Sequence, residues 1–210
     1  MTTSKIAENE LALRDSLWPD AEARSWRRKE HGGFITVPKT FPFLARAMDE
    51  MSKNFPVSDA YLALWAFTWD NSFVRLKNLE DIAFAAGFTG QRGVRTLQDR
   101  LKRLDALGFI ELKASGSNRM AFAYLPNPHE VLFSLRDAQT LPTAEAERKH
   151  LAASLQDATW NAFLARAQEI GCKDVRLFLD IRAGKVPAEP VAPARGKARP
   201  LRRFARSNRS

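Results

Sequence analysis

The sequence predicts a mainly α-helical protein with one small β-hairpin, flanking helices and a disordered basic C-terminal tail. Apolar residues recur at helical spacing in several segments before residue 183. Two short alternating runs, Phe109 to Lys113 and Met120 to Leu125, are separated by the turn sequence Ser-Gly-Ser-Asn. Beyond Lys185 the chain is rich in Pro, Ala and Arg and shows no apolar periodicity, which predicts disorder.

The first 57 residues are predicted to extend a central unit. A short helix is expected over Ser4 to Leu17, followed by a basic stretch and a strand-like run from Phe34 to Val37 that Pro38 closes. Thr40 is a favourable N-cap, and it predicts a helix from Phe41 to about Asn54 with a proline in its first turn.

The central unit is predicted to span residues 58–126. Ser58 is expected to cap a buried helix that runs through Trp69, because its tyrosine, leucines and tryptophans leave no polar face. Both Trp65 and Trp69 are therefore expected in the core. A short extended piece, Phe73 to Leu76, follows that helix.

Two further helices precede the hairpin. Asn78 is expected to cap a helix over Leu79 to Ala86, which Gly87 ends. The clearest helix in the sequence runs from about Gln91 to Leu107, with a leucine-rich stripe and Gly108 as its C-cap. The hairpin over residues 109–125 comes directly after it.

Helices are again predicted in residues 127–184. One long helical stretch is expected from about Thr143 to Ile170, ended by Gly171, and a further helix from Lys173 to Arg182. The helices in residues 143–182 are the expected homodimer or protein-partner surface.

Net charge favours a polyanionic partner. The 210 residues contain 33 Lys and Arg against 24 Asp and Glu, a formal charge of +9. Eight of the basic residues and one acid lie from Ala183 to Ser210, so the rest of the chain is close to neutral. The tail, residues 185–210, is expected to contact DNA, RNA or a protein partner. Its candidate nucleic-acid contacts are Arg195, Lys197, Arg199, Arg202, Arg203, Arg206 and Arg209.

Several function classes have little support. The single cysteine, Cys172, excludes an internal disulfide, and with three scattered histidines it does not predict a four-ligand zinc site. A lowered thiol pKa at a helix start is one interpretation of Cys172, and an incidental cysteine is the other. No nucleophile or paired-carboxylate motif indicates an enzyme, and no cofactor or metal is expected. Without a secretion signal or membrane span, a soluble cytoplasmic protein is expected.

The candidate DNA-binding residues lie on and before the helix predicted from Gln91. Arginine can donate two hydrogen bonds to guanine, and glutamine can pair with adenine. The candidates are Thr89, Gln91, Arg92, Arg95, Thr96, Asp99, Lys102 and Arg103. The arginines at 92 and 95 have three alternative roles: contacting bases, contacting phosphates or pairing with Asp99. Ser72 is a further candidate phosphate contact.

The hairpin turn supplies a second set of polar and basic residues. Such a turn can reach a phosphate or a minor groove beside the helix. Its candidates are Lys113, Ser115, Ser117, Asn118 and Arg119. A plain solvent-exposed turn is the alternative interpretation.

Residues 58–125 resemble a bacterial winged helix-turn-helix domain. The resemblance rests on NLEDIAFAAGFTGQRGVRTLQDRLKRLDALGFIEL (78–112), and its last part, RLKRLDALGFIEL, is similar to regulators and replication proteins of plasmids and phages. FITVPKTF (34–41) resembles the start of replication-initiator winged helices more weakly. The resemblance implies double-stranded DNA binding by a transcriptional regulator or replication-initiator-like protein.

Three alternatives compete with that interpretation. Glycines at 87, 90 and 93 resemble a phosphate loop, but the Gly-Lys-Ser/Thr ending is missing. GFTG also matches the short loop of RNA-binding KH domains, although a leucine-rich helix and hairpin follow it here. Finally, the central unit could be a protein-interaction module in which only the tail touches nucleic acid.

Overall fold

The computed structural model describes residues 3–28, 30–53, 55–69, 71–140 and 146–185. Its fold is mainly helical, as the sequence predicts, and the predicted hairpin is part of one small three-stranded antiparallel sheet. The tail residues from Arg195 to Arg209 lie outside this described part, so their predicted contacts stay predictions. Within the described part, no helix is long and apolar enough to cross a membrane.

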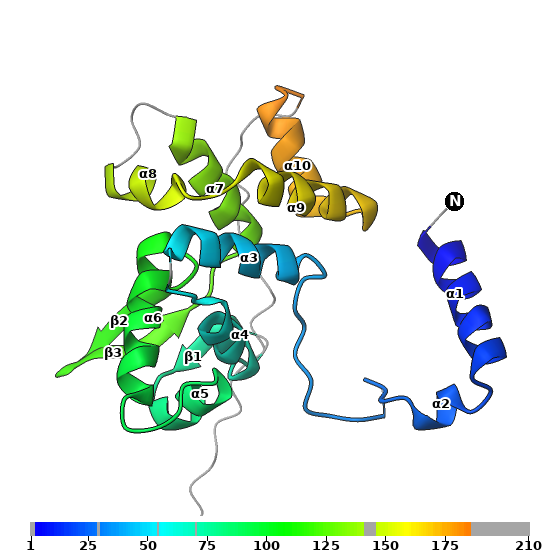
Figure 1. Cartoon of the computed structure of the whole chain (residues 1–210), viewed down its shortest axis with the longest axis horizontal. Coiled ribbons are helices and arrows are strands. Elements are labelled where there is room, and N and C mark those ends of the chain that lie inside the picture. The colour runs from blue at the N-terminus through cyan, green and yellow to red at the C-terminus, as the bar shows by residue number, and fades with distance from the viewer. Residues whose placement is uncertain (1–2, 29, 54, 70, 141–145, 186–210) are drawn as a thin grey trace, which may run out of the picture.

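The N-terminal helices are separate from the core. Helix α1 (Thr3–Leu17) matches its predicted range, and the short α2 (Ala21–Arg24) follows it. Neither has a buried side chain among those described, and both lie away from the remaining helices in Figure 1. The strand predicted over Phe34–Val37 is not formed. An isolated extended segment needs a neighbouring strand to be stable, and this one has none among the described residues.

Helix α3 (Phe41–Ser52) begins where the sequence predicts, with Thr40 as its N-cap residue, but the Thr40 side chain makes no capping hydrogen bond. The Thr40 hydroxyl is fully buried and lies 2.6 Å from His129 Nε2, 89 residues along the chain. A tertiary partner therefore takes the oxygen that a capping bond would use.

Helix α4 (Ser58–Ala66) ends three residues before its predicted end. The predicted cap, Ser58, is instead its first residue, and the cap comes from α3. The Asp49 carboxylate accepts hydrogen bonds from the backbone N–H groups of Val57 and Ser58, at 2.7 and 3.0 Å. It also accepts one from the Ser58 hydroxyl at 2.7 Å. A negatively charged carboxylate at this helix start interacts favourably with the helix dipole, and its hydrogen bonds hold α4 against α3.

The sheet joins chain segments on either side of two helices. Strand β1 (Phe73–Arg75) pairs antiparallel with β3 (Asn118–Tyr124), which pairs antiparallel with β2 (Glu111–Ser115). The strand order is therefore β1-β3-β2. Between β1 and β2 lie α5 (Leu79–Ala85) and α6 (Gly93–Leu107).

Helix α6 begins two residues later than predicted, with Arg92 as its N-cap residue. Three residues of the predicted stripe, Leu97, Leu101 and Leu104, are fully buried, whereas the fourth, Val94, is half-buried, and Leu107 in the last turn is buried as well. Gly108 adopts a left-handed conformation with φ 83° at the C-cap, as predicted. A side chain at this position would strain the backbone, so the glycine explains why α6 stops there.

The C-terminal helices differ most from prediction. The expected single helix over residues 143–170 is two helices, α8 (Ala146–Ala152) and α9 (Asp157–Glu169), while α10 (Lys173–Arg182) is as predicted. Helix α7 (Pro128–Thr140) is an addition to the predicted elements. Its start has a sequence signal, because Asn127 Oδ1 accepts the His129 N–H at 3.0 Å and Pro128 follows this cap.

One hydrophobic core joins the central unit to these C-terminal helices. The core cluster extends from Leu44 on α3, through Leu101 on α6, to Phe163 on α9 and Val175 on α10. Figure 1 shows α3 lying between the helices that follow β3 and the central unit. In residues 143–182, the expected dimer or partner surface, the apolar side chains of Leu151, Leu155, Phe163 and Val175 lie inside the chain's own core.

A carboxylate connects α3 to the start of α9. Glu50 accepts hydrogen bonds from the Thr159 hydroxyl at 2.6 Å and the Gln156 N–H at 3.2 Å, and it pairs with Arg46 at 3.1 Å. Burial acts to raise the pKa of Glu50, but these hydrogen bonds and Arg46 outweigh it, so the pKa lies below its ordinary value. The ionised form is therefore the one that stabilises the fold.

Glu50→Gln is expected to lower the free energy of unfolding by about 1 to 3 kcal/mol at neutral pH. The folded-state pKa is depressed, so this stabilisation is complete above the unfolded-state pKa and is lost as pH falls through the folded-state value. Urea unfolding of both proteins at neutral and acidic pH measures this, and the difference should shrink below pH about 4. A difference that is constant with pH would contradict the assigned role of the charge.

Candidate nucleic-acid interface

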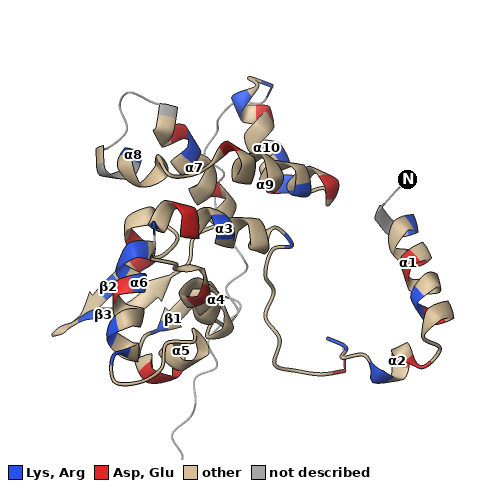
Figure 2. Ribbon diagram, in the orientation of Figure 1, with Lys and Arg blue, Asp and Glu red and all other residues tan. Residues whose placement is uncertain are grey.

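The exposed face of α6 carries the predicted cations. Arg95 and Lys102 lie seven residues apart, two helical turns along one face, and both are exposed. Arg92 is exposed at the helix start, and Thr89 and Gln91 are exposed in the preceding turn. Figure 2 shows basic residues along α6 and on the hairpin beside it. The structure thus places Arg95 and Lys102 on one exposed face of α6 and leaves the other three exposed at or just before its start.

The two arginines at the start of α6 are available to a ligand. In the described part of the chain, the side chains of Arg92 and Arg95 have no hydrogen-bond or ion-pair partner. Asp99, their predicted alternative partner, pairs instead with Lys102 at 3.1 Å. The intramolecular alternative for these arginines is therefore not seen.

Other predicted residues on α6 face different surroundings. Arg103 is half-buried, and its Nη2 donates to the Met51 carbonyl oxygen at 3.0 Å. It thus joins α6 to the end of α3 rather than standing on the exposed face. Thr96 is also half-buried, so its hydroxyl and methyl are only partly accessible.

The hairpin lies within the predicted residues 109–125, its turn is two residues shorter than the predicted Ser-Gly-Ser-Asn turn, and its tip is exposed. Ser115 pairs with Asn118 across a two-residue turn, and Gly116 has a positive φ of 58°, which suits the first turn position. Lys113, Ser117, Asn118 and Arg119 are all exposed. Asn118 Oδ1 accepts the Met120 N–H at 3.0 Å, so this amide is partly engaged in the turn.

The hairpin is held in a defined position against α6. The Leu112 N–H donates to Asp105 Oδ1 at 2.8 Å, joining β2 to the last turn of the helix. Phe109 and Ile110, between the two elements, are fully buried. A rigid connection of this kind fixes where the hairpin tip stands relative to Arg95.

Acidic residues mark one limit of the basic face. Glu80 and Asp81 are in the first turn of α5, and Asp81 is exposed. Figure 2 shows acidic residues in red at α5, at the end of the molecule below α6 and the hairpin. A polyanion bound to α6 and the hairpin would therefore be repelled at the start of α5.

The turn between α5 and α6 depends on glycine. Gly90 has a φ of 77°, and a Cβ atom on Gly93 would lie 2.5 Å from the Phe88 carbonyl oxygen. Only glycine lets the start of α6 approach that carbonyl so closely. The position of Arg92 and Arg95 thus rests on this contact.

Gly93→Ala is expected to destabilise the protein by about 1 to 3 kcal/mol, since a methyl group must displace the backbone of the turn. Denaturant unfolding measures the loss. Gly32→Ala is the matched control, because a Cβ atom on Gly32 would meet no heavy atom within 4 Å and the residue has no positive φ. Equal stability of the two variants would show that the turn adapts without cost.

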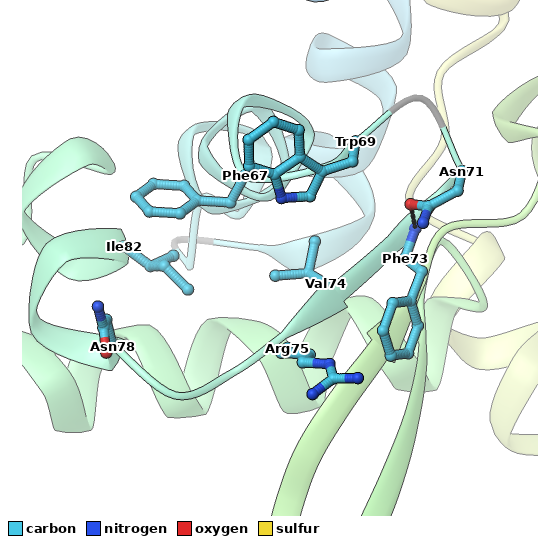
Figure 3. A pocket seen from close by; sticks show the side chains of 8 residues that line it. All are labelled: Phe67, Trp69, Asn71, Phe73, Val74, Arg75, Asn78 and Ile82. Atoms are coloured by element: carbon cyan, nitrogen blue, oxygen red, sulfur yellow. Dashed lines mark hydrogen bonds between the residues drawn. The ribbon is translucent and has the colours of Figure 1, made fainter. Parts of the chain in front are cut away.

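A pocket of about 370 Å³ is a second candidate site. It lies between the end of α4, strand β1 and the start of α5. Figure 3 shows the rings of Phe67 and Trp69 on the opposite side of the pocket from Arg75, with Val74 and Ile82 between them. An apolar hollow with a few polar groups is typical of a binding site.

The prediction that Trp69 lies in the core is wrong. Helix α4 ends at Ala66, and Trp69 is 89% exposed in the loop that follows. Trp65 is half-buried and packs edge-on against Tyr61, with ring centroids 6.3 Å apart, as a core-facing residue does. The exposed aromatic surface also includes Phe84 on α5, which is 75% exposed.

Comparisons with known proteins assign no family. No family model matches the chain, and no solved structure matches it. A bifunctional glutamine synthetase adenylyltransferase/adenylyl-removing enzyme from Chromobacterium violaceum is similar over 91 residues at 40% identity. The match covers 40% of this chain and 10% of that enzyme. The chain thus spans about a tenth of its relative, a share too small to carry over the activity of the whole enzyme.

The thiol of Cys172 is not activated. Burial raises the pKa of Cys172 to about 11, and its hydrogen bond to Asp174 acts in the same direction. The predicted alternative of a lowered thiol pKa at this helix start is therefore wrong, because burial and the neighbouring carboxylate outweigh the helix dipole. His31 and His150 are both exposed, on different segments of the chain.

Proposed function

We propose that residues 58–125 form a winged helix-turn-helix and that the protein binds double-stranded DNA in a sequence-specific manner. The observation that carries this proposal is the pair of arginines, Arg92 and Arg95, at the exposed start of a helix beside a fixed hairpin. Neither side chain has a partner among the described residues. The order of helices and strands, with two helices followed directly by the hairpin, supports the proposal.

In the proposed complex, α6 enters the major groove. Arg92 and Arg95 donate to guanine O6 and N7, and Gln91 pairs with adenine. The hydroxyl of Thr89 and the cation of Lys102 contact phosphates on either side of the groove. Lys113 and Arg119 on the hairpin reach the adjacent backbone or minor groove.

The proposed role is that of a transcriptional regulator or a replication-initiator-like protein of a plasmid, phage or integrative element. Such a protein binds DNA and needs no chemistry of its own. Two copies on adjacent half-sites would supply the specificity that one helix lacks. A homodimer through residues 143–182 would use the outer faces of α8, α9 and α10, since their inner faces pack against the core.

Selection from a randomised duplex library, at about physiological salt, tests the proposal. The full chain and a version truncated after Lys185 are compared. Enrichment of the same motif by both supports base reading by α6, and the spacing of repeated motifs reports dimeric or iterated binding. Failure of both to enrich any motif would overturn sequence-specific binding.

The exposed aromatic residues favour a second function, docking of a protein partner. Trp69, which lines the pocket of Figure 3, and Phe84 on α5 expose large apolar areas, and such surfaces commonly mark interaction sites. In this case the central unit binds a protein and only the tail touches nucleic acid. Loss of all DNA binding on truncation after Lys185, with no motif enriched, would favour this function over the first.

A further inference from the structure

Three potential metal ligands meet where the first turns of α7 and α10 come together. His129 Nδ1, Cys172 Sγ and a carboxylate oxygen of Asp174 lie within 4.8 Å of one another. His129 is in the first turn of α7, Cys172 is the N-cap residue of α10, and Asp174 is in the first turn of α10. A nitrogen from α7 thus lies close to a sulfur and an oxygen from the start of α10, more than 40 residues further along the chain.

The separation of the nitrogen and the sulfur suits a tetrahedral metal ion. Bonds of 2.0–2.1 Å to nitrogen and 2.3 Å to sulfur place these two atoms about 3.6 Å apart around zinc. The measured distance between Cys172 Sγ and His129 Nδ1 is 3.9 Å. Asp174 now accepts hydrogen bonds from both, with its oxygens 2.6 Å from the imidazole nitrogen and 2.8 Å from the sulfur. Ligand atoms around zinc lie about 3.3 to 3.6 Å apart, so the half-exposed carboxylate has to shift outward by less than an ångström to admit the ion.

A buried hydroxyl supports the imidazole from behind. Thr40 Oγ1 lies 2.6 Å from His129 Nε2, and both residues are buried. Metal-bound histidines generally donate their second N–H to an oxygen, which fixes the tautomer and the ring orientation. A hydroxyl can donate or accept a hydrogen bond, so Thr40 can bond to His129 Nε2 whether or not a metal is bound.

The site has a way in from solvent. His129 is only 4% exposed, whereas the Asp174 side chain is 35% exposed and Cys172 is half-buried. A metal can therefore approach from the Asp174 side and keep a water molecule as its fourth ligand. Nitrogen and sulfur donors select zinc-like ions, because magnesium and calcium require mostly oxygen ligands.

We propose that His129, Cys172 and Asp174 bind one divalent transition-metal ion of the zinc type. On binding, the Cys172 thiol loses its proton to solvent and the thiolate forms the metal–sulfur bond. The imidazole carries its proton on Nε2, toward Thr40, and binds through Nδ1. The ion replaces the hydrogen bonds from His129 and Cys172 to Asp174, and it joins α7 to α10 through its coordinate bonds.

Cobalt(II) is the direct probe, because thiolate ligation gives a sulfur-to-cobalt charge-transfer absorption. The untagged full chain, freed of metal by a chelator, is titrated with Co²⁺ and then with Zn²⁺. We expect a charge-transfer band that saturates at one equivalent and disappears when Zn²⁺ displaces the cobalt. Zn²⁺ at about a hundred times its Kd should raise the Tm by roughly 5 to 10 °C.

Variants assign the ligands. Cys172→Ser should lose the charge-transfer band and at least about tenfold in Zn²⁺ affinity, whereas His150→Gln, which removes an exposed imidazole on α8, should change neither. Thr40→Val tests the positioning role of the hydroxyl and should weaken Zn²⁺ binding about 10- to 100-fold.

The absence of a charge-transfer band in the wild-type protein would overturn the proposal. This outcome does not depend on the folding of any variant, because Cys172 is the sole cysteine of the chain. A band that survives in Cys172→Ser, or a Zn²⁺-induced rise in Tm that is equal in the two proteins, would also overturn it.

Discussion

Replacing Arg92 and Arg95 together with alanine is expected to abolish the preference for any one DNA sequence while leaving the fold intact. Both side chains are, in the described part of the chain, without a partner, so their removal breaks no internal contact. A bidentate arginine–guanine pair contributes about 1 to 3 kcal/mol of discrimination, roughly 5- to 150-fold per base. Competition between the selected duplex and a scrambled one, at fixed salt, measures the loss.

Two control variants separate base contacts from charge. Arg24→Ala on α2 removes a cation of the same type that lies far from α6 and pairs with Asp20, and it should leave the sequence preference unchanged. Lys113→Ala should weaken binding to all duplexes alike and reduce the salt slope by about one. If Arg92 and Arg95 also behave like Lys113, they contact phosphates and the bases are read elsewhere.

The candidate interface was largely predictable because its signals are local. The stripe of leucines, Gly108 after it and the Ser-Gly-Ser-Asn turn all act within a few residues of one another, and α6 and the hairpin follow from them. The predicted start of α6 lies two residues too early, since the contact between Gly93 and Phe88 depends on the packing of the turn.

The remaining errors arise from partners distant in the chain. The Thr40 hydroxyl bonds to His129 instead of making the predicted capping bond, and the start of α4 is capped by Asp49 from another helix. Periodicity cannot reveal such contacts, because it describes one helix at a time. The same limit hid the His129, Cys172 and Asp174 cluster, because spacing along the sequence does not connect α7 with α10.

The exposure of Trp69 was the other property that the local sequence pattern did not predict. Trp69 continues the apolar pattern of the buried helix α4, but α4 ends at Ala66 and Trp69 lies exposed beyond that end. Where a helix of such uniform apolarity stops is decided by the surrounding packing, since the sequence itself offers no polar face or glycine there. The pocket beside Trp69 could therefore be found only in three dimensions.

The second large effect is expected from Phe163→Ala on α9. Phe163 is fully buried among Trp160, Phe133 and His129, with ring centroids 5.8, 6.3 and 5.5 Å away. Removing a buried phenyl group costs about 3 to 5 kcal/mol, a large part of the stability of an ordinary domain.

Because the core runs without a break from α3 to α10, Phe163→Ala should lower the stability of the whole described core in one cooperative transition. Urea unfolding followed by both circular dichroism and tryptophan fluorescence tests this, and the two midpoints should fall together. Phe84→Ala, which removes a phenyl group that is 75% exposed, is the control and should change stability by less than about 0.5 kcal/mol. Two separate transitions, of which only one responds to Phe163→Ala, would instead make the C-terminal helices an independent folding unit, free to serve as the interaction surface that the sequence predicts.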